Sequence, residues 1–259
     1  MWVSRIATGS GAVLERNYMV HRRGLIAFLS GFCEPVFFLF SLGMGMGALV
    51  GHITLPDGRV VEYAVFVAPA MLAVSAMNGA VAECVFNVYS KLKYMKLYDA
   101  VLNTPVTPMG IVLGEIAWAL LRGGIYGAAF LALMALMGLT PSAWAFLALP
   151  GVVLIGWTFA ALSMAGTTFI RSWQDYDVVA TLSFLMFMFS ATFTPLETYP
   201  EWVQLLIQAT PLYHGVTLLR GLTTGAVSFG LLIHVAYLIA VAVVSLIVTA
   251  YRMGRALQR

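Results

Sequence analysis

Four charged residues fall inside long apolar runs of the sequence, where a charge is costly and is therefore a candidate for chemistry: Glu34, Glu83, Glu115 and Arg122. At a bilayer centre such a side chain costs about 2.5 to 3.5 kcal/mol on insertion scales, so it usually faces a helix bundle or a water-filled cavity. We expect Arg122 to pair with Glu34 or Glu115. The pair would either fix helix packing or face a substrate. Glu83 and Glu115 lie near predicted helix ends and could instead reach water.

His214, in the stretch "LYHG", is a further candidate. A lone imidazole beside a turn could sense pH or contact a glycan, but we favour a hydrogen-bonding role within its own segment. The other histidines show no metal-ligand spacing. Cys33 and Cys84 both lie in apolar runs and are interpreted as packing residues. We therefore expect this chain to bind no metal or cofactor.

Catalytic motifs are missing from the sequence. There is no G-x-S-x-G, no H-E-x-x-H and no pair of intramembrane aspartates, which argues against an intramembrane hydrolase. There is also no G-x-x-x-x-G-K-[ST] phosphate loop. We therefore expect that the chain is not an enzyme by itself and cannot hydrolyse ATP unaided.

The composition predicts where these residues reside. Of 259 residues, 61% are hydrophobic and 10% are charged, and the mean hydropathy is +0.91, far from the averages of soluble domains. A helix that crosses a bilayer needs about 20 mainly apolar residues. We expect an all-α polytopic membrane protein, with one domain over residues 1–259 and six spans at 24–50, 63–89, 110–137, 145–170, 178–194 and 228–251.

The basic residues predict the orientation. Most lysines and arginines fall on one side of the predicted spans, whereas the opposite loops hold only Arg59 and Arg220. Loops rich in Lys and Arg stay in the cytoplasm. Both termini are therefore expected in the cytoplasm, and the protein is expected in the inner or plasma membrane. Residues 1–23 mix apolar and basic residues and suit an amphipathic helix on the inner membrane surface.

A short segment with an apolar stripe, "KLKYMKLYDAVLNTPVTP", follows the second predicted span on the cytoplasmic side. Apolar residues from Tyr94 to Leu102 recur at helical spacing, so a helix over 91–104 must bury one face. Lipid headgroups would suit the lysines of this stretch. A protein partner would better suit Tyr98, Asp99 and Asn103, because aromatic and directional polar groups are typical of docking surfaces.

A proline-broken segment precedes the last predicted span. Its half-apolar composition predicts two short helices, 200–208 and 212–222, separated at Pro211. Irregular backbone at membrane depth is tolerated only where protein or a water-filled cavity covers it. We therefore expect a re-entrant hairpin over 195–222, and an interfacial loop is the alternative. Its candidate gate residues are Pro195, Glu197, Pro200, Trp202, Pro211, His214 and Arg220.

Five stretches in order, "ERNYMVHRRG", "EPVFFLFSLGMGMG", "LYDAVLNTPVTP", "SATFTPLETYPEW" and "TPLYHGVTLLRG", carry a resemblance that covers essentially the whole chain. The sequence resembles the membrane subunit of a type-2 ABC (ATP-binding cassette) exporter. More narrowly, it is similar to the nodulation-protein J group, whose relatives export lipo-oligosaccharides, polysaccharides and, in a daunorubicin-type branch, drugs.

The resemblance implies partners and roles. The 91–104 segment would be a coupling helix in a cleft of a nucleotide-binding ATPase subunit, and the 195–222 segment would be the family's re-entrant helices. Two ATPase copies would bind ATP and Mg, and a second permease, identical or paralogous, would complete the pathway. No nucleic acid is implied. The candidate coupling residues are Lys93, Tyr94, Leu97, Tyr98, Asp99, Leu102 and Asn103.

The expected function is export of an amphipathic or lipid-linked compound. Efflux of a hydrophobic drug by the same fold is the alternative. From a different class, an ion-driven carrier could use Glu34 and Glu115 as relay groups, although carriers often show two similar halves and none is evident in this sequence.

Overall fold

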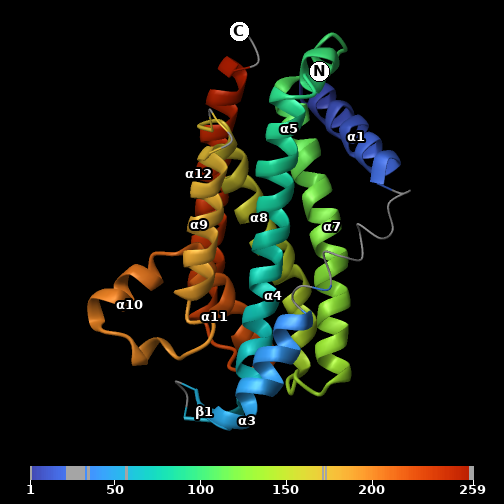
Figure 1. Cartoon of the computed structure of the whole chain (residues 1–259). Helices are drawn as coiled ribbons and strands as arrows, with labels where there is room; N and C mark the ends of the chain where they lie inside the picture. Colours follow the sequence, from blue (N-terminus) through green and yellow to red (C-terminus); the bar gives the residue numbers. More distant parts are fainter. Residues whose placement is uncertain are drawn as a thin grey trace.

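The computed structural model describes residues 2–21, 33, 36–55, 58–170, 172 and 174–256, which form a bundle of long helices with a small hairpin at one end (Figure 1). Glu34 lies outside the described residues. In chain order the elements are α1 (Trp2–His21), the π-helix η1 (Leu39–Met46), α3 (Gly47–Val50), β1 (His52–Thr54), β2 (Val60–Glu62), α4 (Tyr63–Val81), the π-helix η2 (Ala82–Asn87), α5 (Val88–Lys93), α6 (Leu97–Leu102), α7 (Pro108–Leu136), the 3-10 helix η3 (Ala143–Leu147), α8 (Ala148–Thr167), α9 (Gln174–Met188), the 3-10 turn η4 (Leu196–Thr198), α10 (Glu201–Gln208), α11 (Pro211–Thr224) and α12 (Leu231–Ala256).

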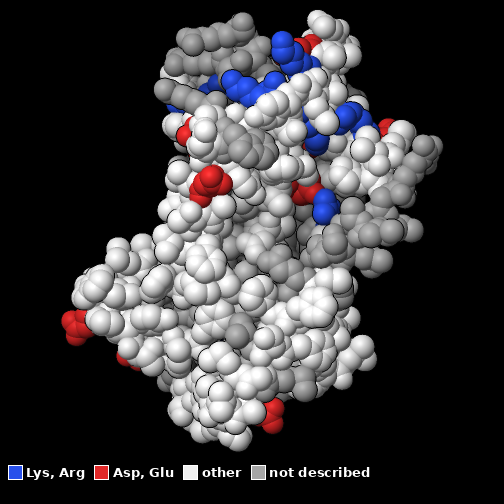
Figure 2. Space-filling model, viewed as in Figure 1, with Lys and Arg blue, Asp and Glu red and all other residues white. Residues whose placement is uncertain are grey.

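The two ends of the bundle differ in charge. Both chain termini, α5 and α1 lie at one end, here called the terminal end, and the β1–β2 hairpin lies at the other, the hairpin end (Figure 1). On the face drawn in Figure 2, the described lysines and arginines gather toward the terminal end and none is seen around the hairpin end. This asymmetry follows the distribution that the sequence predicts.

Within the described part of the chain, four helices are long and apolar enough to cross a membrane: 63–93, 108–136, 143–167 and 231–253. They match the second, third, fourth and sixth predicted spans. Of the predicted span 24–50, the structure describes residues 33 and 36–50, which include η1 and α3 but give no further helix of this length. The fifth, predicted over 178–194, is the 15-residue α9, which ends at Met188 and is shorter than a crossing needs. The chain is thus a mostly helical membrane protein, and six spans stay a prediction.

The centre of the bundle is α4. Its residues Phe66, Val67, Ala68, Ala70 and Met71 are all at most 2% exposed, and it packs against α7, α8 and α11. A helix that is apolar on every side is one that other helices surround. The continuous apolar sequence of α4 therefore explains its central place.

Small residues let the helices approach closely. A Cβ atom at Gly114 of α7 would lie 2.6 Å from the Cβ of Val13 in α1, and one at Gly127 of α7 would lie 2.5 Å from a methyl of Val152 in α8. In a membrane the hydrophobic effect does not drive helices together, because the lipid is itself apolar. Helices therefore associate through close van der Waals packing at small residues such as these. These two glycines therefore fix α1 and α8 against α7.

A β-hairpin between η1 and α4 departs from the all-α expectation. Its strands pair antiparallel, with Ile53 opposite Val61. Gly58, at φ +83°, and a hydrogen bond from its N–H to the carbonyl of Leu55 close the turn. A positive φ is accessible to glycine at little cost, so this residue permits the reversal.

The segment predicted as one coupling helix over 91–104 is divided in the structure. The helix that begins with α4 runs through η2 and α5 to Lys93, so the first residues of the predicted helix belong to the end of a span. The chain then turns at Lys96, a non-glycine residue with φ +45°, and α6 follows. The short helix is therefore α6, Leu97–Leu102.

Two short helices occupy most of the proline-broken segment. Thr210 caps α11, because its hydroxyl accepts a hydrogen bond from the N–H of Tyr213, and Pro211 occupies the first turn. Proline suits that turn since its missing N–H would have no helical partner. Pro211 therefore begins α11. Figure 1 shows α11 within the bundle and α10 standing away from it.

Candidate functional site

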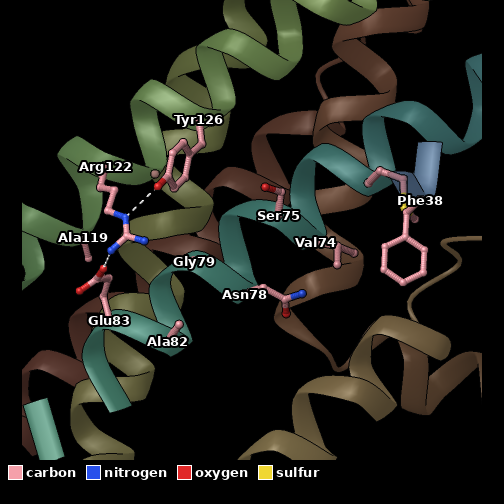
Figure 3. A pocket seen from close by; sticks show the side chains of 12 residues that line it. Phe38, Val74, Ser75, Asn78, Gly79, Ala82, Glu83, Ala119, Arg122 and Tyr126 are labelled. Atoms are coloured by element: carbon pink, nitrogen blue, oxygen red, sulfur yellow. Dashed lines mark hydrogen bonds and ion pairs between the residues drawn. The ribbon is translucent and has the colours of Figure 1, made fainter. Parts of the chain in front are cut away.

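An ion pair joins two helices inside the bundle. The guanidinium of Arg122 in α7 contacts the carboxylate of Glu83 in η2, and its Nε also donates to the hydroxyl of Tyr126 at 3.1 Å (Figure 3). The other carboxylate oxygen of Glu83 accepts from the side-chain amide of Asn87 at 2.7 Å. The pair is thus compensated by further hydrogen bonds, as a charge pair away from water requires.

The local backbone places Glu83 for this contact. Glu83 is the second residue of η2, where the helix that began with α4 widens to π-helical turns. Single π-helical turns within α-helices occur frequently at functional sites. The distortion is therefore compatible with a functional role of the ion pair as well as with packing.

A cavity of about 140 Å³ opens beside the pair, between α4, η2 and α7. Ser75 and Asn78 add polar groups to its wall and Phe38 adds an aromatic ring (Figure 3). The side chain of Arg122 is 22% exposed and that of Glu83 is 7% exposed. The site can therefore offer hydrogen-bond donors and acceptors to a small polar group between the helices.

The expected partners of Arg122 need correction. Arg122 pairs with Glu83, not with Glu115, and the alternative partner Glu34 lies outside the described residues. Glu83 and Glu115 are 6% and 3% exposed, so the idea that they reach water is wrong. Glu115 and Arg122 are seven residues apart in the sequence, a spacing that places both on one helix face but does not show which neighbouring helix each one meets.

Glu115 is the centre of a second buried network. Its Oε2 accepts from the ammonium group of Lys91 at 2.7 Å and from the side-chain amide of Asn17 at 2.8 Å. Its Oε1 accepts from the hydroxyl of Tyr98 at 3.0 Å. The carboxylate thus ties α1, α5 and α6 to α7.

Tyr98 is buried within this network, which corrects its expected role at a partner surface. Its side chain is 2% exposed. Burial, and secondly the Glu115 carboxylate, raise the pKa of Tyr98, so the phenol stays protonated and donates to Glu115. Leu97 and Leu102 pack partly against the core as well. From Leu97 onward the stripe faces its own bundle, whereas its first member, Tyr94, is exposed.

The exposed surface of the same segment lies on its other side. Tyr94 and Met95 are 65% and 67% exposed. Lys93, Asp99 and Asn103 are exposed too. We call these five residues the α5–α6 tip: Lys93, Tyr94, Met95, Asp99 and Asn103. Met95, which the sequence reasoning passed over, could have been identified because it interrupts the buried stripe.

His214 makes the kind of contacts favoured from the sequence, but with a partner that sequence reasoning missed. Its Nε2 lies 2.9 Å from the carbonyl oxygen of Gln208, and its Nδ1 lies 2.7 Å from Nδ1 of His234 in α12. Since a carbonyl only accepts, His214 donates from Nε2, and the neutral ring accepts from His234 at Nδ1. Tyr237 stacks on His214, with ring centroids 3.8 Å apart. The three-residue spacing of His234 and Tyr237 indicated a shared helix face.

The other gate candidates divide into two groups. Pro195, Glu197 and Arg220 line a cavity at the hairpin end. Pro200 precedes the first turn of α10, Pro211 begins α11, and Trp202 on α10 is 68% exposed. The structure therefore brings only part of the predicted gate set to one place.

Comparisons with known proteins place these features in context. A family model described as "ABC-2 type transporter" matches residues 10–224. The chain is also 31% identical over 251 residues to Nodulation protein J of Rhizobium leguminosarum bv. viciae, covering 96% of this chain and 95% of the relative. Nodulation protein J of Rhizobium meliloti (strain 1021) is 30% identical over 249 residues, with 95% and 93% covered. That of Sinorhizobium fredii (strain NBRC 101917 / NGR234) is 33% identical over 235 residues, with 90% and 87% covered.

Proposed function

Because the chain belongs to the ABC-2 type transporter family, we propose that it is the membrane subunit of an exporter that moves an amphipathic or lipid-linked compound, such as a lipo-oligosaccharide or glycolipid, out of the cytoplasm or the inner leaflet. Two copies of a separate ATPase bind ATP and Mg, since this chain has no phosphate loop. A second permease, identical or paralogous, completes the pathway. The terminal end faces the cytoplasm, a placement that the basic residues there support.

The observation that carries the proposal is the Glu115 network. The α5–α6 tip is exposed and offers aromatic, basic and acidic groups to a partner. Directly behind it, Tyr98 and Lys91 hold Glu115 at 3.0 and 2.7 Å. Hydrogen bonds to a buried carboxylate are among the stronger ones in proteins. A displacement of the tip therefore moves α7 with it.

In the proposed mechanism, helix α7 transmits this movement to the ion pair of Arg122 and Glu83. Arg122 follows Glu115 by seven residues, or about 10 Å along α7. A shift of α7 relative to α4 and η2 changes the distance between Arg122 and Glu83, and with it the cavity beside them. In this mechanism ATP binding to the partner moves the tip, α7 moves, and the 140 Å³ cavity changes shape. Each state needs different contacts, since a ligand shifts an equilibrium only through differential affinity.

The test is purification of the tagged chain from its native membrane in mild detergent, followed by mass spectrometry of the bound proteins. We expect an ATPase with a phosphate loop, and the same experiment identifies the second permease as a copy or a paralogue. The chain eluting without any ATPase at low and at high salt would overturn the proposal.

A tip variant makes this experiment specific. Changing Tyr94 and Asp99 together to Ala should lower ATPase recovery about tenfold or more, because interface hot spots of this kind each contribute about 2 kcal/mol. Both side chains are exposed, so folding should not change. A matched control is the exposed pair Trp202→Ala and Leu205→Ala on α10, which should leave ATPase recovery unchanged.

A further inference from the structure

A cavity of about 880 Å³ at the hairpin end has not yet been given a role. It lies between the hairpin, Phe66 of α4, the segment after α9, α11 and the start of α12 with the residues before it, so segments far apart in the sequence build it. Cavities of about 300 to 1,000 Å³ are typical of sites for small molecules. This one has both apolar and charged lining residues, which restricts the kind of molecule it fits.

Two arginines line this cavity: Arg59, which donates to the carbonyl of Thr224 at 2.8 Å, and Arg220. Arg220 is the candidate for ligand binding. Its Nε donates to the carbonyl of Phe66 at 3.1 Å, and one terminal nitrogen donates to the carbonyl of Ala191 at 2.9 Å. The guanidinium carbon lies 3.7 Å from the centre of the Phe66 ring. The side chain is therefore held in one position by α4 and by the segment after α9.

No carboxylate of the described residues lies within ion-pair distance of Arg220, although the charge of Glu197 on the same cavity wall favours the charged guanidinium. A guanidinium has five N–H donors, and only two are used here. The ion pairs found between described residues are Lys91 with Glu115 and Arg122 with Glu83, and neither includes Arg220. A cation that is sheltered from water without an anion is unfavourable unless a ligand supplies one.

The backbone beside Arg220 is strained. Ala191 has φ +54°, a left-handed conformation that is unfavourable for a residue with a Cβ. This conformation presents its carbonyl to Arg220. Backbone strain of this kind clusters at ligand sites.

We propose that Arg220 binds the oxyanion headgroup, phosphate or carboxylate, of an amphipathic molecule in this cavity. The three free N–H groups suit two oxygens of one headgroup, because the guanidinium fork matches such anions. Leu55, Leu196, Leu231 and Ile233 line the remainder of the cavity and accept the apolar part. Glu197 lines it too and opposes the anion. The site deepens the proposed export function, since a released compound would be received here, but binding needs no ATPase.

The test is calorimetric titration of the purified chain in phosphatidylcholine nanodiscs, with empty nanodiscs subtracted. Hexyl phosphate should bind, whereas hexyl glucoside, which has no charge, and inorganic phosphate, which has no apolar part, should bind at least about tenfold more weakly. Equal binding of hexyl phosphate and hexyl glucoside would overturn the anion site. Equal binding of inorganic phosphate would overturn the amphipathic part.

Variants assign the binding to Arg220. Arg220→Met should weaken hexyl phosphate about tenfold or more, and Arg220→Lys should weaken it less. Arg252→Met is the matched control, since Arg252 also bonds to a carbonyl, that of Thr168, and lies 3.7 Å over the ring of Phe169. It should leave the affinity unchanged.

Glu197→Gln gives a result that does not depend on removing the partly buried side chain of Arg220. Glu197 is exposed, and the change removes a negative charge from the same cavity, so hexyl phosphate should bind a few-fold more tightly. Affinity that is the same in the wild type, Glu197→Gln and Arg220→Met would overturn the site. The recovery of an ATPase with the chain is a separate measurement and is unaffected by that result.

A titration in nanodiscs of a second lipid composition shows whether the bound headgroup belongs to a membrane lipid or to a compound from outside the bilayer. Replacing part of the phosphatidylcholine with phosphatidic acid lowers the apparent affinity for hexyl phosphate if the site takes a membrane lipid. An unchanged affinity means that the site takes a compound from outside the bilayer. Either result supports the site and identifies its source.

Discussion

A single carboxylate, Glu115, accepts hydrogen bonds from three elements that are far apart in the sequence. Lys91, Asn17 and Tyr98 all converge on it. The lysine is buried with it, so the pair is stable only while both charges are present. This dependence is what makes the site testable by single changes.

We expect Glu115→Gln to destabilise the protein by about 3 to 5 kcal/mol, because Lys91 is then buried without a counter-charge. Thermal unfolding in detergent measures the loss. Changing Lys91 to Met in the same chain should restore much of the stability. Asp99→Asn is the control and should shift the free energy of unfolding by no more than about 0.5 kcal/mol, because Asp99 is exposed. A stable single variant would contradict the network.

Variants of Arg122 and Glu83 can distinguish a role of their ion pair in helix packing from a role in transport. Arg122→Met leaves Glu83 buried without a counter-charge, so both yield and transport should fall. In the double variant with Glu83→Gln, stability should return toward wild type. Transport that returns with stability identifies a packing pair, and transport that stays low identifies a role in the pathway.

Among the elements, α10 differs from the rest because it stands away from the bundle (Figure 1). Trp202, Leu205 and Leu206 are 68%, 69% and 62% exposed. An exposed apolar face of this kind marks contact with lipid or protein. The sequence predicted the bounds of this helix closely, since Pro200 and Pro211 flank it.

We expect Trp202 to lie in lipid, so brominated acyl chains should quench its fluorescence. The measurement compares wild type with Trp202→Phe in vesicles with and without brominated phosphatidylcholine. The loss of a quenchable component in the variant supports the expectation. Equal quenching of the two chains would mean that another copy of the chain or water covers this face.

At the scale of the whole molecule, helix contacts depend on positions where a side chain would not fit. Gly127 meets Val152 of α8, whereas nothing lies within 4 Å of a Cβ atom at Gly123 on the same helix. Gly127→Ala should therefore destabilise the protein by about 1 to 3 kcal/mol, because the added methyl overpacks the contact. Gly123→Ala should be neutral or stabilising, since alanine favours a helix. Thermal unfolding of both variants checks the contrast.

Much of this architecture could be predicted from the sequence, and the resemblance to type-2 ABC exporters is confirmed. Long apolar runs predict spans because length and hydropathy suffice for that. The partner of Arg122 could not be predicted, because it depends on how α7 and η2 are rotated against each other. Tyr98 was misplaced for a related reason: an apolar stripe shows that a face is buried, but not whether its own bundle or another subunit covers it.

The continuous helix of 63–93 has a mechanical consequence. Its 31 residues extend about 46 Å, whereas a hydrocarbon core is about 30 Å thick. The α5–α6 tip is thus carried on a stalk, with Pro69 near the opposite end as a point where the helix can bend. From Pro69 to Lys93 the helix measures about 36 Å, so a bend of about 10° there would sweep the tip through about 6 Å. In the proposed mechanism this helix would act as a lever, and a large displacement of the tip would become a small shift among the helices beside Pro69.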